Sequence, residues 1–200
     1  GGPVVAGALR VAVHAATQGQ EPLTDVVVVA MGRQGGREIM YGSDLDAMFV
    51  HRPRPGADDE AAGAQAEAVA RHVVSLLKQP AAPPLPGERP LEVDADLRPE
   101  GRQGPLVRTL DSYREYYRRW AEVWERQALL RARPVAGDDG LADEFRRWAD
   151  SVRHAQGLTD ADAREIRRIK ARVEAERLPR GADPARHVKL GRGGLSDVEL

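Results

Sequence analysis

The sequence contains no cysteine among its 200 residues, so disulfide bonds and thiolate metal sites are excluded. It also lacks an excess of charge of one sign, because 30 Lys and Arg residues stand against 31 Asp and Glu residues. This balance gives no electrostatic reason to expect a nucleic-acid or membrane partner. An anionic ligand must therefore be held by local groups rather than by a general positive field.

Long apolar runs are missing as well. No run approaches the roughly 20 residues needed to cross a bilayer, and the start GGPVVAGALR lacks the layout of a signal peptide. We therefore expect a soluble, cytoplasmic protein. None of the 5 histidines has ligand spacing, so none is assigned to a metal. Because there is no initiating Met and the chain stops on LSDVEL, we expect a piece of a longer protein.

The first half of the chain carries strand patterns. The β-branched run DVVVVAMG (residues 25–32) and the segment LDAMFVH (45–51) predict two buried strands, and LEVDADL (91–97) alternates like a third. Helices are predicted for residues 4–16 and 58–79, the second with acids in its first turn and Lys in its last.

The second half of the chain is helical in pattern. Beyond Thr109 the apolar residues recur at spacings of three and four, which is typical of helices. Three such segments follow one another, at residues 112–133, 141–154 and 159–178. The order of strands first and helices after predicts two domains, residues 1–109 and 110–200.

Pairs of acids mark the predicted strands. Asp44 and Asp46 stand one residue apart, and side chains at i and i+2 share a face of a strand. Adjacent carboxylates repel each other, and Mg²⁺ relieves the repulsion because it prefers carboxylate and phosphate oxygens. Asp94 and Asp96 repeat the pattern, so the acids converge if the two strands are neighbours. The alternative is that surface strands often carry Asp without binding anything.

Glycine and basic residues near these acids predict contacts with phosphate groups. The Gly35-Gly36 turn and Ser43 would supply backbone N–H and hydroxyl donors. Arg98 follows the third strand and Lys189 precedes a glycine-rich segment, so both could neutralise phosphate oxygens. Solvated arginines and plain glycine turns are the alternative interpretation. The spacing fits neither a Walker A loop nor a Rossmann fingerprint.

A double-glycine turn, a Ser-Asp-x-Asp strand and a third acid on a later strand resemble the nucleotidyltransferase superfamily typified by DNA polymerase beta. Five ordered segments are also similar to blocks of the glutamine synthetase adenylyltransferase family: GRQGGREIMYGSDLDAMFV, VDADLRPEGRQGPLVRTL, YYRRWAEVWERQALLRARPVAGD, EIRRIKARVEAERLPRGADP and KLGRGGLSDVE. The resemblance implies an α+β fold, with a mixed sheet flanked by helices and followed by an all-helical bundle.

The family resemblance also implies a reaction, the transfer of AMP from ATP to a tyrosine hydroxyl of glutamine synthetase. Two Mg²⁺ ions would be held by Asp44, Asp46 and Asp94, and glutamine synthetase and the PII signalling protein would be the partners. The later blocks look more like the C-terminal, adenylylating copy of actinobacterial members than the deadenylylating copy, which releases ADP. A non-catalytic module that binds nucleotide or PII is the other alternative. Asp96 departs from the family, in which many members carry Arg at this position.

Overall fold

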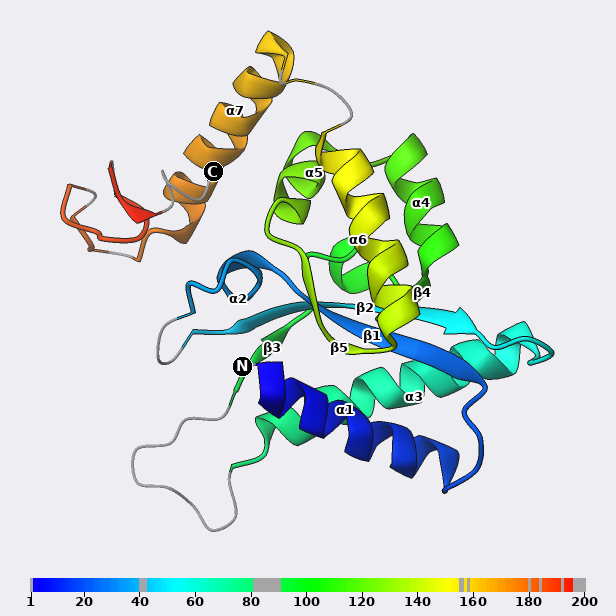
Figure 1. Ribbon diagram of the computed structural model, residues 1–200. Coiled ribbons are helices and arrows are strands. Elements are labelled where there is room, and N and C mark those ends of the chain that lie inside the picture. The colour runs from blue at the N-terminus through cyan, green and yellow to red at the C-terminus, as the bar shows by residue number, and fades with distance from the viewer. Residues whose placement is uncertain are drawn as a thin grey trace.

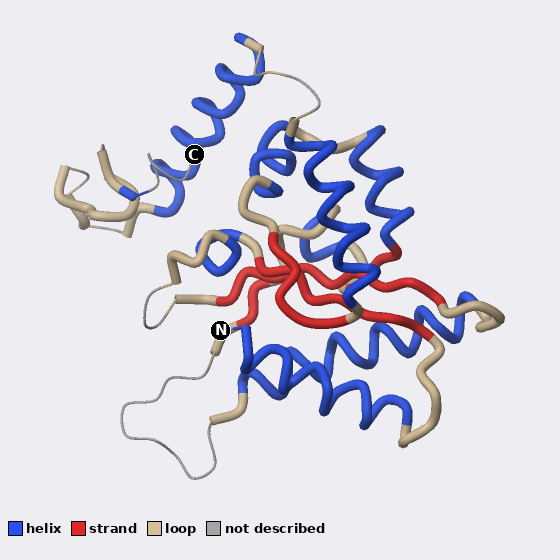
Figure 2. The backbone as a smooth tube through the Cα atoms, in the orientation of Figure 1, coloured by secondary structure: helices blue, strands red, loops and turns tan. Residues whose placement is uncertain are grey.

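The computed structural model shows an α+β fold in which a mixed sheet lies between two layers of helices (Figures 1 and 2). None of the helices in the described part of the chain is long and apolar enough to span a membrane. The structure describes residues 2–39, 43–80, 91–154, 157, 159–179, 181–183, 185–191 and 193–195.

The sheet is mixed because its strands run in both directions. Strand β1 is antiparallel to both β2 and β5, whereas β3 and β4 are parallel to β2. The path through the sheet is β3-β2-β1-β5, with β4 also pairing with β2. The bounds are β1 (Thr24–Ala30), β2 (Leu45–Pro53), β3 (Val93–Asp94), β4 (Val107–Thr109) and β5 (Arg133–Gly137).

Helices α1 (Gly2–Thr17) and α3 (Asp59–Lys78) cover one face of the sheet. Val26, Val28 and Phe49 point into this layer and are buried there. Helix α3 begins at an Asp58 side chain that accepts the N–H of Ala61, and ends near Lys78, as the charge pattern predicts.

The opposite face is covered by α4 (Leu110–Arg119), α5 (Val123–Leu129) and α6 (Asp139–Arg153). Val27, Val29 and Val50 are buried in this second core cluster together with Tyr113, Phe145 and Trp148. The valines of β1 therefore alternate between two cores, which explains why the strand is an unbroken apolar run rather than an alternating one.

Two expectations about the strands are wrong. The third strand is shorter than residues 91–97 and comprises Val93 and Asp94 alone. The sequence analysis also assigns no strand beyond residue 109, yet β5 lies there and pairs with β1.

The separate helical bundle is not seen in the described residues. Helices α4 to α6 share a core with the sheet, which gives the predicted division at residue 109 no support. The remaining long helix, α7 (Asp160–Arg177), contacts α5 and extends away from the sheet (Figure 1).

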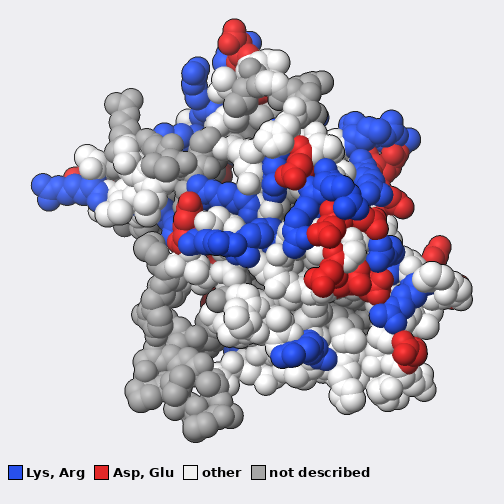
Figure 3. Space-filling model, in the orientation of Figure 1, with Lys and Arg blue, Asp and Glu red and all other residues white. Residues whose placement is uncertain are grey.

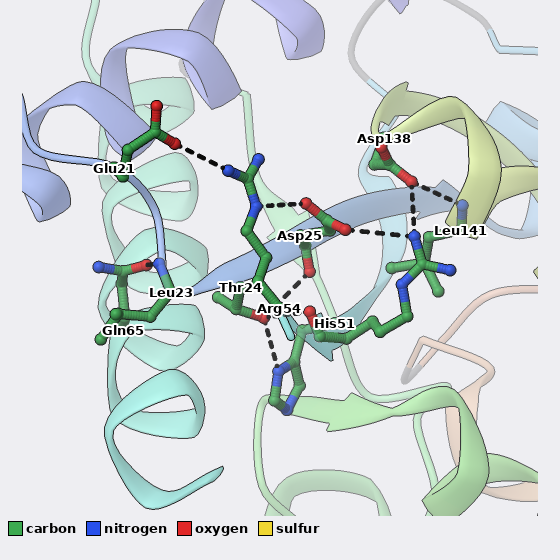
Figure 4. Close-up of polar contacts among 10 residues, drawn as sticks. Glu21, Leu23, Thr24, Asp25, His51, Arg54, Gln65, Asp138 and Leu141 are labelled. Carbon is green, nitrogen blue, oxygen red and sulfur yellow. Dashed lines mark hydrogen bonds and ion pairs between the residues drawn. The ribbon is translucent and has the colours of Figure 1, made fainter. Parts of the chain in front are cut away.

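Opposite charges meet where β1 begins (Figure 4). Asp25 accepts hydrogen bonds from Arg54 Nε at 2.8 Å and from Arg52 Nη2 at 3.2 Å. Beside them the hydroxyl of Thr24 lies 3.0 Å from His51 Nδ1, and the His51 side chain is buried. Burial lowers the pKa of His51 against an opposing effect of Asp59. Burial therefore favours the neutral form of the ring.

We predict that His51 makes the fold sensitive to acid. Its folded-state pKa is depressed, so its contribution is fully present above the unfolded pKa and is lost as the pH falls through the folded value. Urea unfolding between about pH 5 and pH 7 should show a free energy of unfolding that falls on the acid side. His51→Gln should flatten that slope, whereas exposed His14→Gln should keep it. Equal slopes for the chain and for His51→Gln would contradict this account.

Candidate functional site

Two carboxylates lie side by side on neighbouring parallel strands. The register of β2 and β3 pairs Asp46 with Asp94, so the expected convergence of the two acidic strands is confirmed. Strand β2 begins at Leu45, and Asp44 stands exposed immediately before it. The paired strands have apolar neighbours that anchor them, since Leu45 is buried and Val93 packs against the same core cluster. The acids are thus carried on a rigid edge of the sheet.

The electrostatics of Asp46 show how closely the acids are grouped. Burial, followed by the charges of Asp94 and Asp44, raises the pKa of Asp46 from 3.8 to about 6. The positive charges of Lys189 and Arg33 act in the opposite direction. Asp46 is therefore a partly desolvated carboxylate whose negative form is disfavoured by its acidic neighbours and favoured by nearby cations.

Asp94 and Asp96 do not share a face, contrary to the i, i+2 expectation. Strand β3 ends at Asp94, and the chain then turns so that the Asp96 N–H donates to Asp94 Oδ1 at 2.7 Å. The Asp96 carboxylate accepts a hydrogen bond from Arg102 Nε at 2.6 Å and lies 3.8 Å from Arg98 Nη1. Asp96 therefore orients Asp94 through its backbone while its own side chain pairs with arginines.

Gly32 is a site residue that the sequence analysis did not single out. Its φ is +47°, and a Cβ at this position would overlap Asp46 Oδ2 and lie 3.0 Å from Asp46 Cγ. Only glycine lets the backbone lie against the carboxylate here. The available signal is a glycine at the end of the apolar run DVVVVAMG, which the strand pattern explains equally well as a strand end.

The predicted Gly35-Gly36 turn has a packing role in the structure. Gly35 closes the one-turn helix α2 (Gly32–Gly35), and a Cβ on it would lie 2.7 Å from the carbonyl oxygen of Ala30. The N–H of Gly35 donates to Met31 O at 2.8 Å and that of Gly36 to Gly32 O at 3.1 Å. Both N–H groups are therefore used inside the turn rather than presented to a ligand.

The other three predicted phosphate contacts lie in different surroundings. Arg98 is buried, and its guanidinium donates to the carbonyl oxygens of Ala95 at 2.7 Å, Gly104 at 3.2 Å and Arg102 at 3.3 Å. Ser43 is half-buried beside the exposed Asp44. Lys189 is exposed, and its charge acts on Asp46 from the far end of the chain. Ser43 and Lys189 are thus grouped with the acids, whereas Arg98 braces the loop after β3.

Arginines surround α2 beside the acids. Figure 3 shows Lys and Arg side chains gathered over α2 and the start of β5. Near α2, Arg131 pairs with Glu38 at 3.4 Å, and Arg133 donates to two carbonyl oxygens of α2. Arg33 lies on α2 itself and acts on Asp46. The acidic group is therefore bordered on this side by positive charge.

The donor chemistry of the acids fits a hard divalent cation. Within the described ranges, no three Asp, Glu, His or Cys side chains stand close enough together to form a ready metal cage. The charged form of Asp46 is nevertheless disfavoured by burial and by two acidic neighbours, and a bound cation would oppose both effects. Mg²⁺ is commonly held by one or two carboxylates, with substrate phosphate and water completing its shell. Asp44, Asp46 and Asp94 are the carboxylates that such a partial set would use.

The comparisons with known proteins all point to one enzyme family. The family model described as glutamate-ammonia ligase adenylyltransferase matches residues 4–148. A bifunctional glutamine synthetase adenylyltransferase/adenylyl-removing enzyme of Streptomyces avermitilis is 57% identical over 98% of the chain. Enzymes of the same name from Mycobacterium avium and Mycolicibacterium smegmatis are 59% and 53% identical over 87% and 98% of it.

The chain is much shorter than these relatives. It spans 19% of the Streptomyces protein, 17% of the Mycobacterium protein and 19% of the Mycolicibacterium protein. A similarity of this extent concerns about a fifth of each relative, so it does not by itself say which of the two named activities this part performs.

We predict that the charged Asp46 side chain destabilises the fold when no cation is bound. Removing its charge by Asp46→Asn relieves the repulsion from Asp94 and Asp44, and should stabilise the chain in EDTA by about 1–2 kcal/mol after allowance for solvent screening. Thermal unfolding should therefore show a higher Tm for Asp46→Asn in EDTA. The gain should shrink or reverse in excess Mg²⁺.

The matched control is Asp96→Asn. Its carboxylate pairs with arginines rather than with acids, so this change should leave Tm unchanged or lower it in either buffer. A lower Tm for Asp46→Asn in EDTA would show that the acidic group is not under electrostatic strain.

Proposed function

The chain belongs to the glutamate-ammonia ligase adenylyltransferase family, and on that premise we propose that it transfers AMP from ATP to a tyrosine hydroxyl of glutamine synthetase. The observation that carries the proposal is the register that sets Asp46 beside Asp94, with Asp44 adjoining. A module that only binds nucleotide has no need to group acids that repel one another.

Asp44, Asp46 and Asp94 would hold the divalent cations in this proposal. Bound there, Mg²⁺ would neutralise charge that develops on the phosphate oxygens during transfer. Strands β2 and β3 fix the spacing of Asp46 and Asp94 within the sheet. These two residues would therefore determine where a bound cation lies. Gly32 supports the arrangement by allowing the backbone to lie against the Asp46 carboxylate.

Asp94 is the residue proposed to accept the proton of the attacking hydroxyl. The tyrosine oxygen forms a bond to the α-phosphorus while the bond from that phosphorus to the bridging oxygen breaks, and pyrophosphate leaves. One Asp94 oxygen is fixed by the Asp96 N–H, which holds the carboxylate in a defined orientation. An acceptor held in this way can abstract a proton in a fixed geometry.

Ser43 and Lys189 are proposed to contact the β- and γ-phosphates. Ser43 adjoins the acids in sequence and could donate through its hydroxyl, while the Lys189 charge lies close enough to affect Asp46. Gly35, Gly36 and Arg98 would support this site indirectly, because their polar groups are used within α2 and the loop after β3. The positive border around α2 opposes the repulsion between the acids and a triphosphate.

The partners follow from the family. Glutamine synthetase is the protein substrate named for the relatives, and we propose it for this chain. The helices in residues 110–200 would help to position that substrate and the PII signalling protein.

We predict that AMP, not phosphate alone, becomes attached to the protein substrate. Incubating the chain with glutamine synthetase, Mg²⁺ and ATP labelled at the α-phosphate should transfer label to a tyrosine and release pyrophosphate. The matching incubation uses adenylylated glutamine synthetase and phosphate. Release of ADP there, without label transfer in the first reaction, would assign the chain to the deadenylylating activity instead.

We predict that Asp94 matters far more than Asp96 for the same transfer. Asp94→Ala removes a carboxylate from the acidic group and should lower kcat at least about 100-fold. Asp96→Ala keeps the N–H that orients Asp94 and loses only the pairing with arginines, so its effect should be about tenfold or less. Initial rates at saturating Mg²⁺ and ATP decide the matter, and equal losses would show that Asp94 has no special part in the proton transfer.

A further inference from the structure

Arg133 joins β5 to the C-terminal end of α2. Its Nε donates to Gly35 O and its Nη2 to Gln34 O, both at 3.0 Å, across separations of 98 and 99 residues. The Gln34 carbonyl also accepts the N–H of Arg37 at 3.4 Å, so Arg133 adds to the contacts that end the helical turn. Burial and the nearby charge of Arg37 lower the pKa of Arg133, so the guanidinium is held in this position at an electrostatic cost.

The other end of α2 lies against Asp46. A Cβ on Gly32, the first residue of α2, would overlap Asp46 Oδ2. Met31, directly before it, donates its N–H to Asp46 O at 2.8 Å. The carboxylate and the backbone of Asp46 are therefore both in contact with the segment that begins α2.

Between these two ends the turn has little room to move. A Cβ on Gly35 would lie 2.9 Å from the carbonyl carbon of Arg131, and the Gln34 side chain is buried. A single helical turn of four residues is not stable by itself. Its position must therefore be set by its contacts with the rest of the protein, those at its two ends included.

We propose that Arg133 is a positioning residue for Asp46, holding α2 from β5 so that Gly32 keeps the Asp46 carboxylate facing Asp94. Its two bonds to α2 are the means by which Arg133 acts. The inference rests on the proposed function, because it assigns Arg133 to the same acidic site. It couples the edge strand β5 to the place where a divalent cation would be held.

The test compares Arg133→Lys and Gly32→Ala with the unchanged chain. Lysine keeps the charge but cannot form the two-pronged contact with both carbonyls. Arg52→Lys is the matched control, because Arg52 lies about 20 Å along β2 from Asp46 and also joins separate elements, through Asp25, Asp138 and Glu144. All of these variants should unfold cooperatively.

The first readout is an NMR measurement on the metal-free chain. Backbone amide NMR shifts of Gly32 and Asp46 should move in Arg133→Lys and stay in place in Arg52→Lys. The second readout is Mn²⁺ binding measured by calorimetry, where Arg133→Lys and Gly32→Ala should weaken the affinity about tenfold. In transfer assays, Arg133→Lys should need more Mg²⁺ but approach the normal kcat at saturation.

Several results would overturn the inference. They are equal Mn²⁺ affinities of the chain and Arg133→Lys, unmoved amide shifts at Asp46, or an equal loss in Arg52→Lys. A failure of the proposed function is distinct from these. If the unchanged chain releases ADP from adenylylated substrate and transfers no AMP, the activity assignment falls, while a tenfold loss of Mn²⁺ affinity in Arg133→Lys still supports the positioning role.

Discussion

Repulsion between Asp46 and Asp94 is the constraint on which this end of the molecule depends. Parallel strands lie about 4.8 Å apart, and the register of β2 and β3 places these two acids directly across that gap. A parallel pair requires a crossover connection, which α3 supplies between β2 and β3 on one face of the sheet. The topology thus brings together two charges that would otherwise separate, and the nearby Lys189 and Arg33 offset only part of their repulsion.

The rest of the fold can bear this strain because the sheet is buried on both faces. On β2, which carries Asp46, Met48 and Val50 pack against one helical layer and Ala47 and Phe49 against the other, so this strand is held in place from both sides. The opposite end of the sheet shows the contrast. There Asp25 is paired with Arg52 and Arg54, and charge is balanced within the protein. Charge left unbalanced at one end and balanced at the other is the pattern expected of a binding site on a stable scaffold.

The elements predicted correctly are those whose signals are local. Strand β1 follows from a run of valines and α3 from charges at its ends, and neither needs information from elsewhere in the chain. Strand β5 was missed because Pro134 and Gly137 argue against a strand, although proline is compatible with an edge position. The third strand was predicted too long because LEVDADL alternates beyond Asp94, whereas a hydrogen bond from the Asp96 N–H to Asp94 turns the chain there. That contact competes with the ladder and leaves no mark in the apolar pattern.

The residues of the candidate site also differ in how well local sequence signals predict their roles. Asp44, Asp46 and Asp94 could be grouped from spacing and family resemblance, and the register of β2 and β3 bears out the pairing of Asp46 with Asp94. Glycine and arginine are ambiguous, since each serves packing as readily as it serves a ligand. Gly35 and Arg98 resemble phosphate contacts in the sequence, yet one packs on a carbonyl and the other binds three of them. Conversely, Gly32 has the appearance of a strand end but lies against Asp46, and only the three-dimensional contact distinguishes a glycine that shapes the site from one that closes a turn.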